Sequence, residues 1–97
     1  MRQAAVRRKI TEIQARVSAM REEIAVLDEQ IDALDAEAED LRVRAVVSET
    51  PLAVKEHSEA SRHAHLAHRA RTSAFEQLRN LELQRDALLE KISAEVA

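Results

Sequence analysis

The sequence predicts an all-α protein in which two long helices form an antiparallel coiled-coil hairpin. Its 97 residues include no Gly and one Pro, whereas β-sheet folds need turn residues roughly every 8 to 12 positions. Apolar residues recur at alternating steps of four and three, which is the heptad spacing of coiled coils. With 34% charged and 45% hydrophobic residues, the chain has the balance of amphipathic helices rather than of disordered segments.

The first helix is predicted over about residues 3–47, where the heptad spacing runs without interruption. The positions that we assign to the apolar seam are Val6, Ile10, Ile13, Val17, Met20, Ile24, Leu27, Ile31, Leu34, Ala38, Leu41 and Ala45. In heptad notation the a positions are 10, 17, 24, 31, 38 and 45, and the d positions are 6, 13, 20, 27, 34 and 41. Such a stripe has to be covered by another helix.

A turn is predicted at about residues 48–50, because the heptads stop just before the one proline, Pro51. The residue that precedes a proline is disfavoured in helical conformation, and proline itself suits the first position of a helix. Thr50 is therefore expected to cap the second helix, which should run over about residues 51–95. The chain is then a single helical hairpin, residues 1–97.

The second helix continues the alternating steps of four and three, but with smaller residues at these positions. Its predicted seam is Ala53, His57, Ala60, Ala64, Ala67, Arg71, Ala74, Leu78, Leu81, Arg85, Leu88 and Ile92. If the chain folds back at the turn, facing seam residues have numbers that sum to about 98. Large residues of the first helix then face alanines of the second helix near the turn, as in the predicted pair Leu34 and Ala64.

Charge favours the hairpin over the main alternative, a kinked helix that pairs in parallel with a second copy. β-Branched residues at a with Leu or Met at d would suit that parallel dimer. Residues 22–40, however, carry nine acids and no Lys or Arg, whereas residues 57–77 hold three Arg and all four His against two Glu. The hairpin places these segments together, with Asp28 near His68, Glu37 near His63 and Arg44 near Glu56.

Three polar residues interrupt the predicted seam of the second helix: His57, Arg71 and Arg85. A structural role within the seam is expected, and the alternative is that they set its register. The long arginine stems can lie along apolar surface while the guanidinium groups reach acids nearby. The expected partners are Asp28 or Glu23 for Arg71, and Glu12 for Arg85.

Large apolar residues outside the seam predict contacts with a partner or with a second copy: Val26, Val47, Leu52, Leu66, Phe75 and Leu89. They would join two hairpins into a four-helix bundle, although scattered apolar surface residues need no partner. The expected partners are thus a second copy, giving a homodimer, or another protein. Around the turn, Val46, Val47, Leu52 and Val54 form either a contact surface or a small core that closes the turn.

Catalytic and metal chemistry find no support in the sequence, and no cofactor is expected. There is no Cys and no glycine loop for phosphate, and a hairpin has no deep cleft for a catalytic triad. Of the four histidines, only His65 and His68 have a spacing that suits chelation on a helix. Structural or solvated histidines are favoured over a pH-sensitive interface and over a metal site.

A basic cluster at the start of the chain is the candidate for nucleic-acid contact: Arg2, Arg7, Arg8 and Lys9. The net charge of −3 gives no general attraction to nucleic acid, and Glu90 and Glu95 are expected to neutralise the cluster. Nucleic acid is therefore not the expected partner. Without a long apolar run, neither a signal peptide nor a membrane span is expected, so a cytoplasmic protein is predicted. Twelve Arg against three Lys suggest a bacterial genome rich in GC.

The helix-turn-helix form resembles that of small secreted bacterial proteins whose defining turn is Trp-x-Gly, replaced here by Ser48-Glu49-Thr50-Pro51. It is also similar to the coiled-coil arms of transcript-cleavage factors, whose paired tip acids correspond here to Glu49 alone. These resemblances cover the architecture only. The predicted function is a non-enzymatic coiled-coil module for protein–protein interaction or assembly. The alternative is an accessory arm of nucleic-acid machinery that binds RNA polymerase or RNA.

Overall fold

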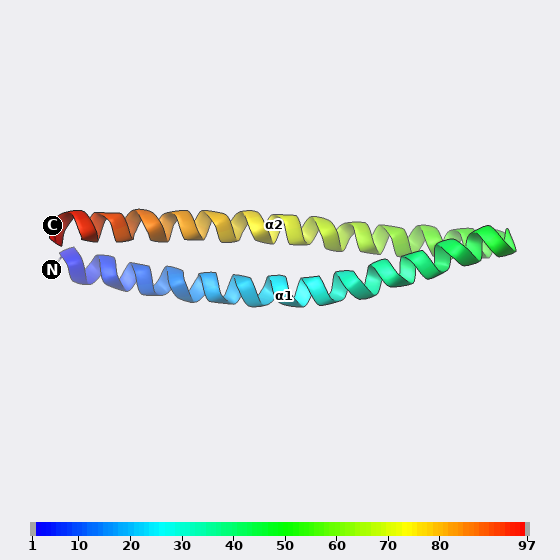
Figure 1. The fold of residues 1–97 in the computed structure, drawn as a ribbon, viewed down its shortest axis with the longest axis horizontal. Coiled ribbons are helices and arrows are strands. Elements are labelled where there is room, and N and C mark those ends of the chain that lie inside the picture. Colours follow the sequence, from blue (N-terminus) through cyan, green and yellow to red (C-terminus); the bar gives the residue numbers. More distant parts are fainter. Residues whose placement is uncertain (1, 97) are drawn as a thin grey trace. The chain divides into compact units, whose positions relative to one another are not determined.

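The computed structural model describes residues 2–96 and confirms the predicted all-α hairpin. Helix α1 spans Arg2–Ser48 and helix α2 spans Pro51–Val96, with Glu49 and Thr50 between them. The two helices are antiparallel (Figure 1), and their bounds lie within about one residue of those predicted. Because α2 of the same chain covers the seam of α1, the parallel alternative is excluded.

Two compact units make up the chain, and each contains part of both helices. The terminal unit consists of the residues up to Ile24 together with those from Ser73 onward, and the turn unit is Ala25–Thr72. Every predicted seam residue is buried or half-buried. The heptad assignment is thus confirmed in both units.

The terminal unit has a core that consists mostly of branched aliphatic side chains. Its buried residues are Ile13, Val17, Ile24, Ala74, Leu78 and Leu81. Val17 is the most enclosed of these, with 0% of its surface exposed. This unit therefore contains the part of the seam most sensitive to a polar substitution.

The turn unit is held together by a layer of alanines against larger residues. Its buried residues are Ile31, Ala60 and Ala64, and its other seam residues, Leu34 among them, are half-buried. Alanine leaves room for a close approach of the facing helix, as the predicted pairing of large with small residues requires.

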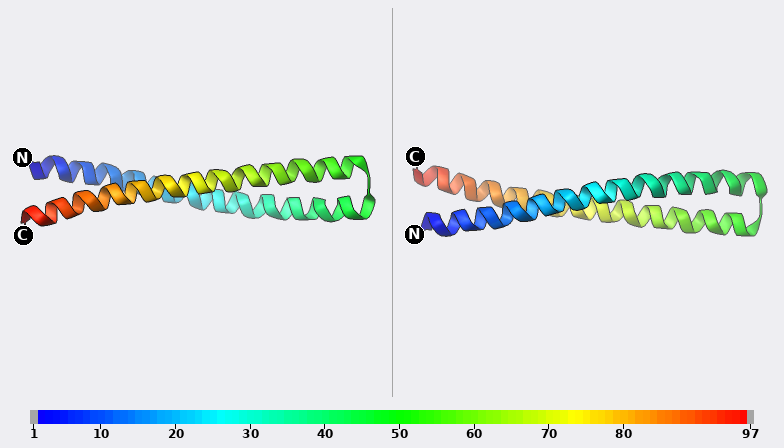
Figure 2. Two further views of the ribbon diagram at one scale, coloured as in Figure 1. Left: turned by 90° about the horizontal axis from the view of Figure 1, so that it is seen from above. Right: turned by 90° about the horizontal axis from the view of Figure 1, so that it is seen from below.

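The turn between the helices is seen in Figure 2, and a cap on each side defines it. The N–H of Glu49 donates to the carbonyl of Ala45 at 3.1 Å, and Glu49 has a φ of 52°, so it is the left-handed residue that ends α1. The hydroxyl of Thr50 accepts a hydrogen bond from the N–H of Ala53 at 3.2 Å, which confirms Thr50 as the cap of α2. Pro51 occupies the first position of α2.

Replacing Glu49 by Gly is expected to stabilise the fold. A residue with a Cβ costs roughly 1–2 kcal/mol in the left-handed region. Glycine avoids this cost, but it loses more conformational entropy on folding, which offsets part of the gain. We expect the free energy of unfolding, measured by urea denaturation, to rise by about 0.5–1 kcal/mol. Glu49→Ala is the control, because alanine keeps the Cβ. Equal stability of the two variants would contradict the assignment.

Candidate protein-interaction surfaces

One flank of the seam, which we call the paired side, carries the polar contacts between the helices. In the terminal unit, Arg21 binds Glu82 at 3.1 Å and Arg85 donates to the side-chain oxygen of Gln14 at 3.0 Å. In the turn unit, Nε2 of His68 lies 3.0 Å from both carboxylate oxygens of Asp35, and Arg71 binds Asp28. The α1 residues of these contacts, together with Arg42, recur every seven residues at the e positions of the heptads.

The Arg71 pair was predicted, and its hydrogen bond with Asp28 raises the pKa of Arg71. The partner predicted for Arg85 was wrong. Arg85 binds Gln14 and Asp86 rather than Glu12, because Glu12 occupies a c position on the opposite flank of α1. The His68 ring binds Asp35, while Asp28, which was predicted to lie near His68, binds Arg71.

His57 is half-buried at its predicted seam position. On the paired side, the guanidinium of Arg42 binds Glu39 at 2.8 Å. Hydrogen bonding to Arg42 lowers the pKa of Glu39, and the charge of His57 acts weakly in the same direction.

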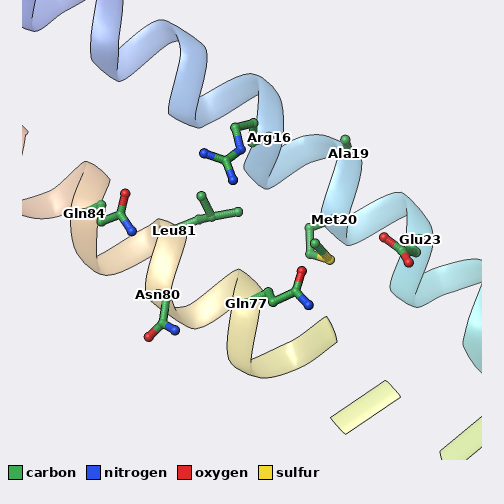
Figure 3. A pocket seen from close by; sticks show the side chains of 8 residues that line it. All are labelled: Arg16, Ala19, Met20, Glu23, Gln77, Asn80, Leu81 and Gln84. Atoms are coloured by element: carbon green, nitrogen blue, oxygen red, sulfur yellow. The ribbon is translucent and has the colours of Figure 1, made fainter. Parts of the chain in front are cut away.

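The opposite flank, which we call the groove side, is formed by the c and g positions of both helices. In the terminal unit it contains a groove of about 350 Å³ (Figure 3). The lining residues are Arg16, Ala19, Met20, Glu23, Gln77, Asn80, Leu81 and Gln84. Met20 and Leu81 lie between the helices, and the polar residues form the rim.

The groove side of the turn unit contains a second groove, of about 370 Å³. It is lined by Glu37, Leu41, Arg44, Glu56, Glu59, Ala60 and His63. The predicted neighbours Arg44 and Glu56, and likewise Glu37 and His63, thus line one groove. Among the described side chains, no ion pair joins the charged residues of either groove.

Five exposed apolar residues of the turn unit surround the turn. We call Val43, Val46, Val47, Leu52 and Val54 the turn-end cluster; their exposed fractions are 48, 64, 79, 66 and 54%. These values exclude the alternative of a small core that closes the turn. The cluster is a surface in contact with solvent.

The other predicted partner contacts are distributed over two further places. Val26 and Leu66, 52 and 51% exposed, occupy c positions on the groove side of the turn unit. Phe75 and Leu89 occupy e positions on the paired side of the terminal unit, where Leu89 lines a shallow groove with Arg7. The six predicted contacts therefore do not form one stripe.

The basic cluster lies in the first turns of α1. Arg7, Arg8 and Lys9 are exposed, whereas the side chain of Arg2 falls outside the described part of the structure. Glu90 and Glu95 are also exposed, and among the described side chains no ion pair joins them to the cluster. The expected neutralisation by these two acids is not present as direct contacts.

Within residues 2–96, no group of three or more His, Asp or Glu side chains is arranged to hold a metal ion. Neither helix, over the same residues, has a stretch long and apolar enough to span a bilayer. Comparison with models of protein families, with curated protein sequences and with solved structures finds no match.

Proposed function

We propose that this protein is a non-enzymatic module for protein–protein interaction, acting in the bacterial cytoplasm, whose turn-end cluster binds a partner protein. The observation that carries the proposal is the exposure of five large apolar side chains within residues 43–54. Such groups are favourable to bury, at about 25 cal/mol per Å² of apolar surface. Contiguous exposed apolar patches commonly mark interaction sites.

The two caps of the turn support this proposal because they fix the backbone that presents the cluster. The N–H of Glu49 binds the carbonyl of Ala45 at the end of α1, and the hydroxyl of Thr50 binds the N–H of Ala53 at the start of α2. A surface that is already ordered before binding loses little conformational entropy when a partner docks. The expected partner has an apolar pocket that receives the valines and the leucine of the turn-end cluster.

Affinity capture from the source organism, followed by affinity measurements with the purified partner, tests the proposal. The variant is Val46→Glu, in the cluster. The matched control is Leu83→Glu, which places the same charge at a similarly exposed residue, 55% against 64%, in the terminal unit. We expect Val46→Glu to weaken partner binding at least tenfold and Leu83→Glu to leave it unchanged. A partner that binds both variants equally would overturn the proposal.

The basic cluster supports a second candidate, an accessory arm that contacts nucleic acid. Its observation is that Arg7, Arg8 and Lys9 are exposed and, among the described side chains, form no ion pair. Such a site predicts retention on RNA or DNA that decreases steeply with salt and disappears when all three residues are changed to Ala. Absence of retention at low salt would exclude this candidate.

A further inference from the structure

The groove side and the paired side differ in how their charges are satisfied. The five ion pairs of residues 2–96 all involve seam, paired-side or adjacent b positions: Arg21–Glu82, Arg42–Glu39, His68–Asp35, Arg71–Asp28 and Arg85–Asp86. The charged groups at the c and g positions of the same residues form none. We infer that a second copy of this chain covers the groove side, with the terminal unit of each copy against the turn unit of the other.

Charge complementarity supports this arrangement. Among the side chains that the structure describes, the groove side of the terminal unit carries three basic and two acidic residues: Lys9, Arg16, Lys91, Glu12 and Glu23. The groove side of the turn unit carries four acidic residues and one basic residue: Glu37, Asp40, Glu56, Glu59 and Arg44. Pairing like units would set the acidic surface against itself, at a cost in electrostatic repulsion. Pairing unlike units sets basic residues against acidic ones.

The sizes of the side chains agree with the same arrangement. The c positions of the terminal unit hold mostly small residues, including Ala5, Ala19, Ala87 and Ala94, all exposed. Those of the turn unit include Val26, Val47, Leu52 and Leu66, with 51 to 79% of their surface exposed. Large residues of one surface thus meet small residues of the other, as in a well-packed helix interface.

The charges also define a register. When Lys9 and Lys91 of one copy lie against Asp40 and Glu59 of the other, the antiparallel direction sets Ala5 opposite residue 44, so Val47 lies within one helical turn of Ala5. Two heptads from Ala5, Ala19 then lies close to Leu66 of the other copy. Electrostatic pairing and apolar packing therefore agree on the register to within one helical turn.

This inference goes beyond the proposed function, because the dimer uses the groove side, which shares only Val47 and Leu52 with the turn-end cluster. Val43, Val46 and Val54 occupy f, b and e positions, outside the groove side, so most of the turn-end cluster stays accessible in the dimer. Failure of the Val46→Glu test leaves the dimer intact, and failure of the dimer tests leaves the turn-end cluster available to a partner.

Crosslinking tests the direction of the two copies, and the absence of cysteine from the chain makes single cysteines unambiguous. Variants Ala5→Cys and Val47→Cys are treated with a short bis-maleimide, separately and as a mixture. We expect covalent dimers only in the mixture, since residue 5 of one copy lies within one helical turn of residue 47 of the other. Dimers from each variant alone would show that like units pair, and absence of crosslinking in the mixture would overturn the inference.

Charge reversal tests the same contact by sedimentation equilibrium. We expect Lys9→Glu with Lys91→Glu, and separately Asp40→Lys with Glu59→Lys, to raise the dimer dissociation constant at least tenfold. All four changes together should restore it. The control, Glu22→Lys with Glu29→Lys, makes the same charge change as Asp40→Lys with Glu59→Lys, but at outward f positions, and should leave the dissociation constant unchanged.

Circular dichroism of each variant establishes that the helices are retained. A wild-type chain that is monomeric at high micromolar concentration would overturn the inference. The inference would equally be overturned if the four combined reversals failed to restore a dimer that each pair had weakened.

Discussion

Val17→Asp is expected to unfold the protein. Val17 has 0% of its surface exposed and lies in the aliphatic core of the terminal unit. A carboxylate at this site would lose its hydration without gaining a hydrogen-bond donor. We expect a loss of roughly 4–5 kcal/mol or more, which is comparable to the whole stability of a small domain. Circular dichroism should show little helix at room temperature.

The control for this variant is Ala15→Asp, which introduces the same residue two positions away. Ala15 is exposed and occupies an outward f position, so its carboxylate remains hydrated. Its effect should be limited to the difference in helix propensity, about 0.7 kcal/mol or less. A folded Val17→Asp protein with the melting temperature of the control would contradict the described core.

Ala64→Leu is expected to destabilise the turn unit although it adds apolar surface. Ala64 is buried, with 6% of its surface exposed, and the alanine layer leaves no space for three further carbons. Overpacking of this kind typically costs about 1–3 kcal/mol, because side chains leave their preferred rotamers or the helices separate. Urea denaturation should show a lower midpoint with an unchanged slope.

The matched control is Ala36→Leu, since Ala36 is exposed on the outward face of α1 and leucine is nearly as good a helix former as alanine. We expect its unfolding midpoint to stay close to that of the wild type. An Ala64→Leu protein more stable than this control would mean that the helices of the turn unit are farther apart than the structure places them.

Much of the fold could be predicted from the sequence, because the heptad period decides which side of each helix is buried. All twenty-four assigned seam positions, from Val6 to Ile92, are buried or half-buried. Even Arg71 and Arg85, which are charged, lie where the period places them. Periodicity is reliable here because no glycine and only one proline interrupt it.

The partners of individual side chains could not be predicted in the same way. Arg85 had acids and amides within reach on both flanks of α1, and the choice of Gln14 over Glu12 depends on the flank toward which the guanidinium turns. The register placed His68 near Asp28, but it does not specify that the ring binds Asp35. These outcomes depend on rotamers and competition, which a repeat does not encode.

The surfaces were predicted in part. The exposure of Val47 and Leu52 follows from their positions outside the seam. Because Val46 and Val54 are apolar as well, the sequence also allowed a small core that closes the turn. Glu49 as the left-handed cap of α1 was not foreseen. A signal was present: with no glycine in the chain, a residue with a side chain had to take this role between Ser48 and Thr50.

The two-residue turn also has a consequence for the order in which the chain folds. Contacts of the turn unit join residues that are closer in sequence than those joined in the terminal unit. Asp28 and Arg71 in the turn unit are 43 positions apart, whereas Gln14 and Arg85 in the terminal unit are 71 positions apart. Closing a longer loop costs more entropy, so local contacts form first. Folding should therefore begin at the turn and proceed toward the chain ends, and substitutions near Glu49 should change the folding rate more than the unfolding rate.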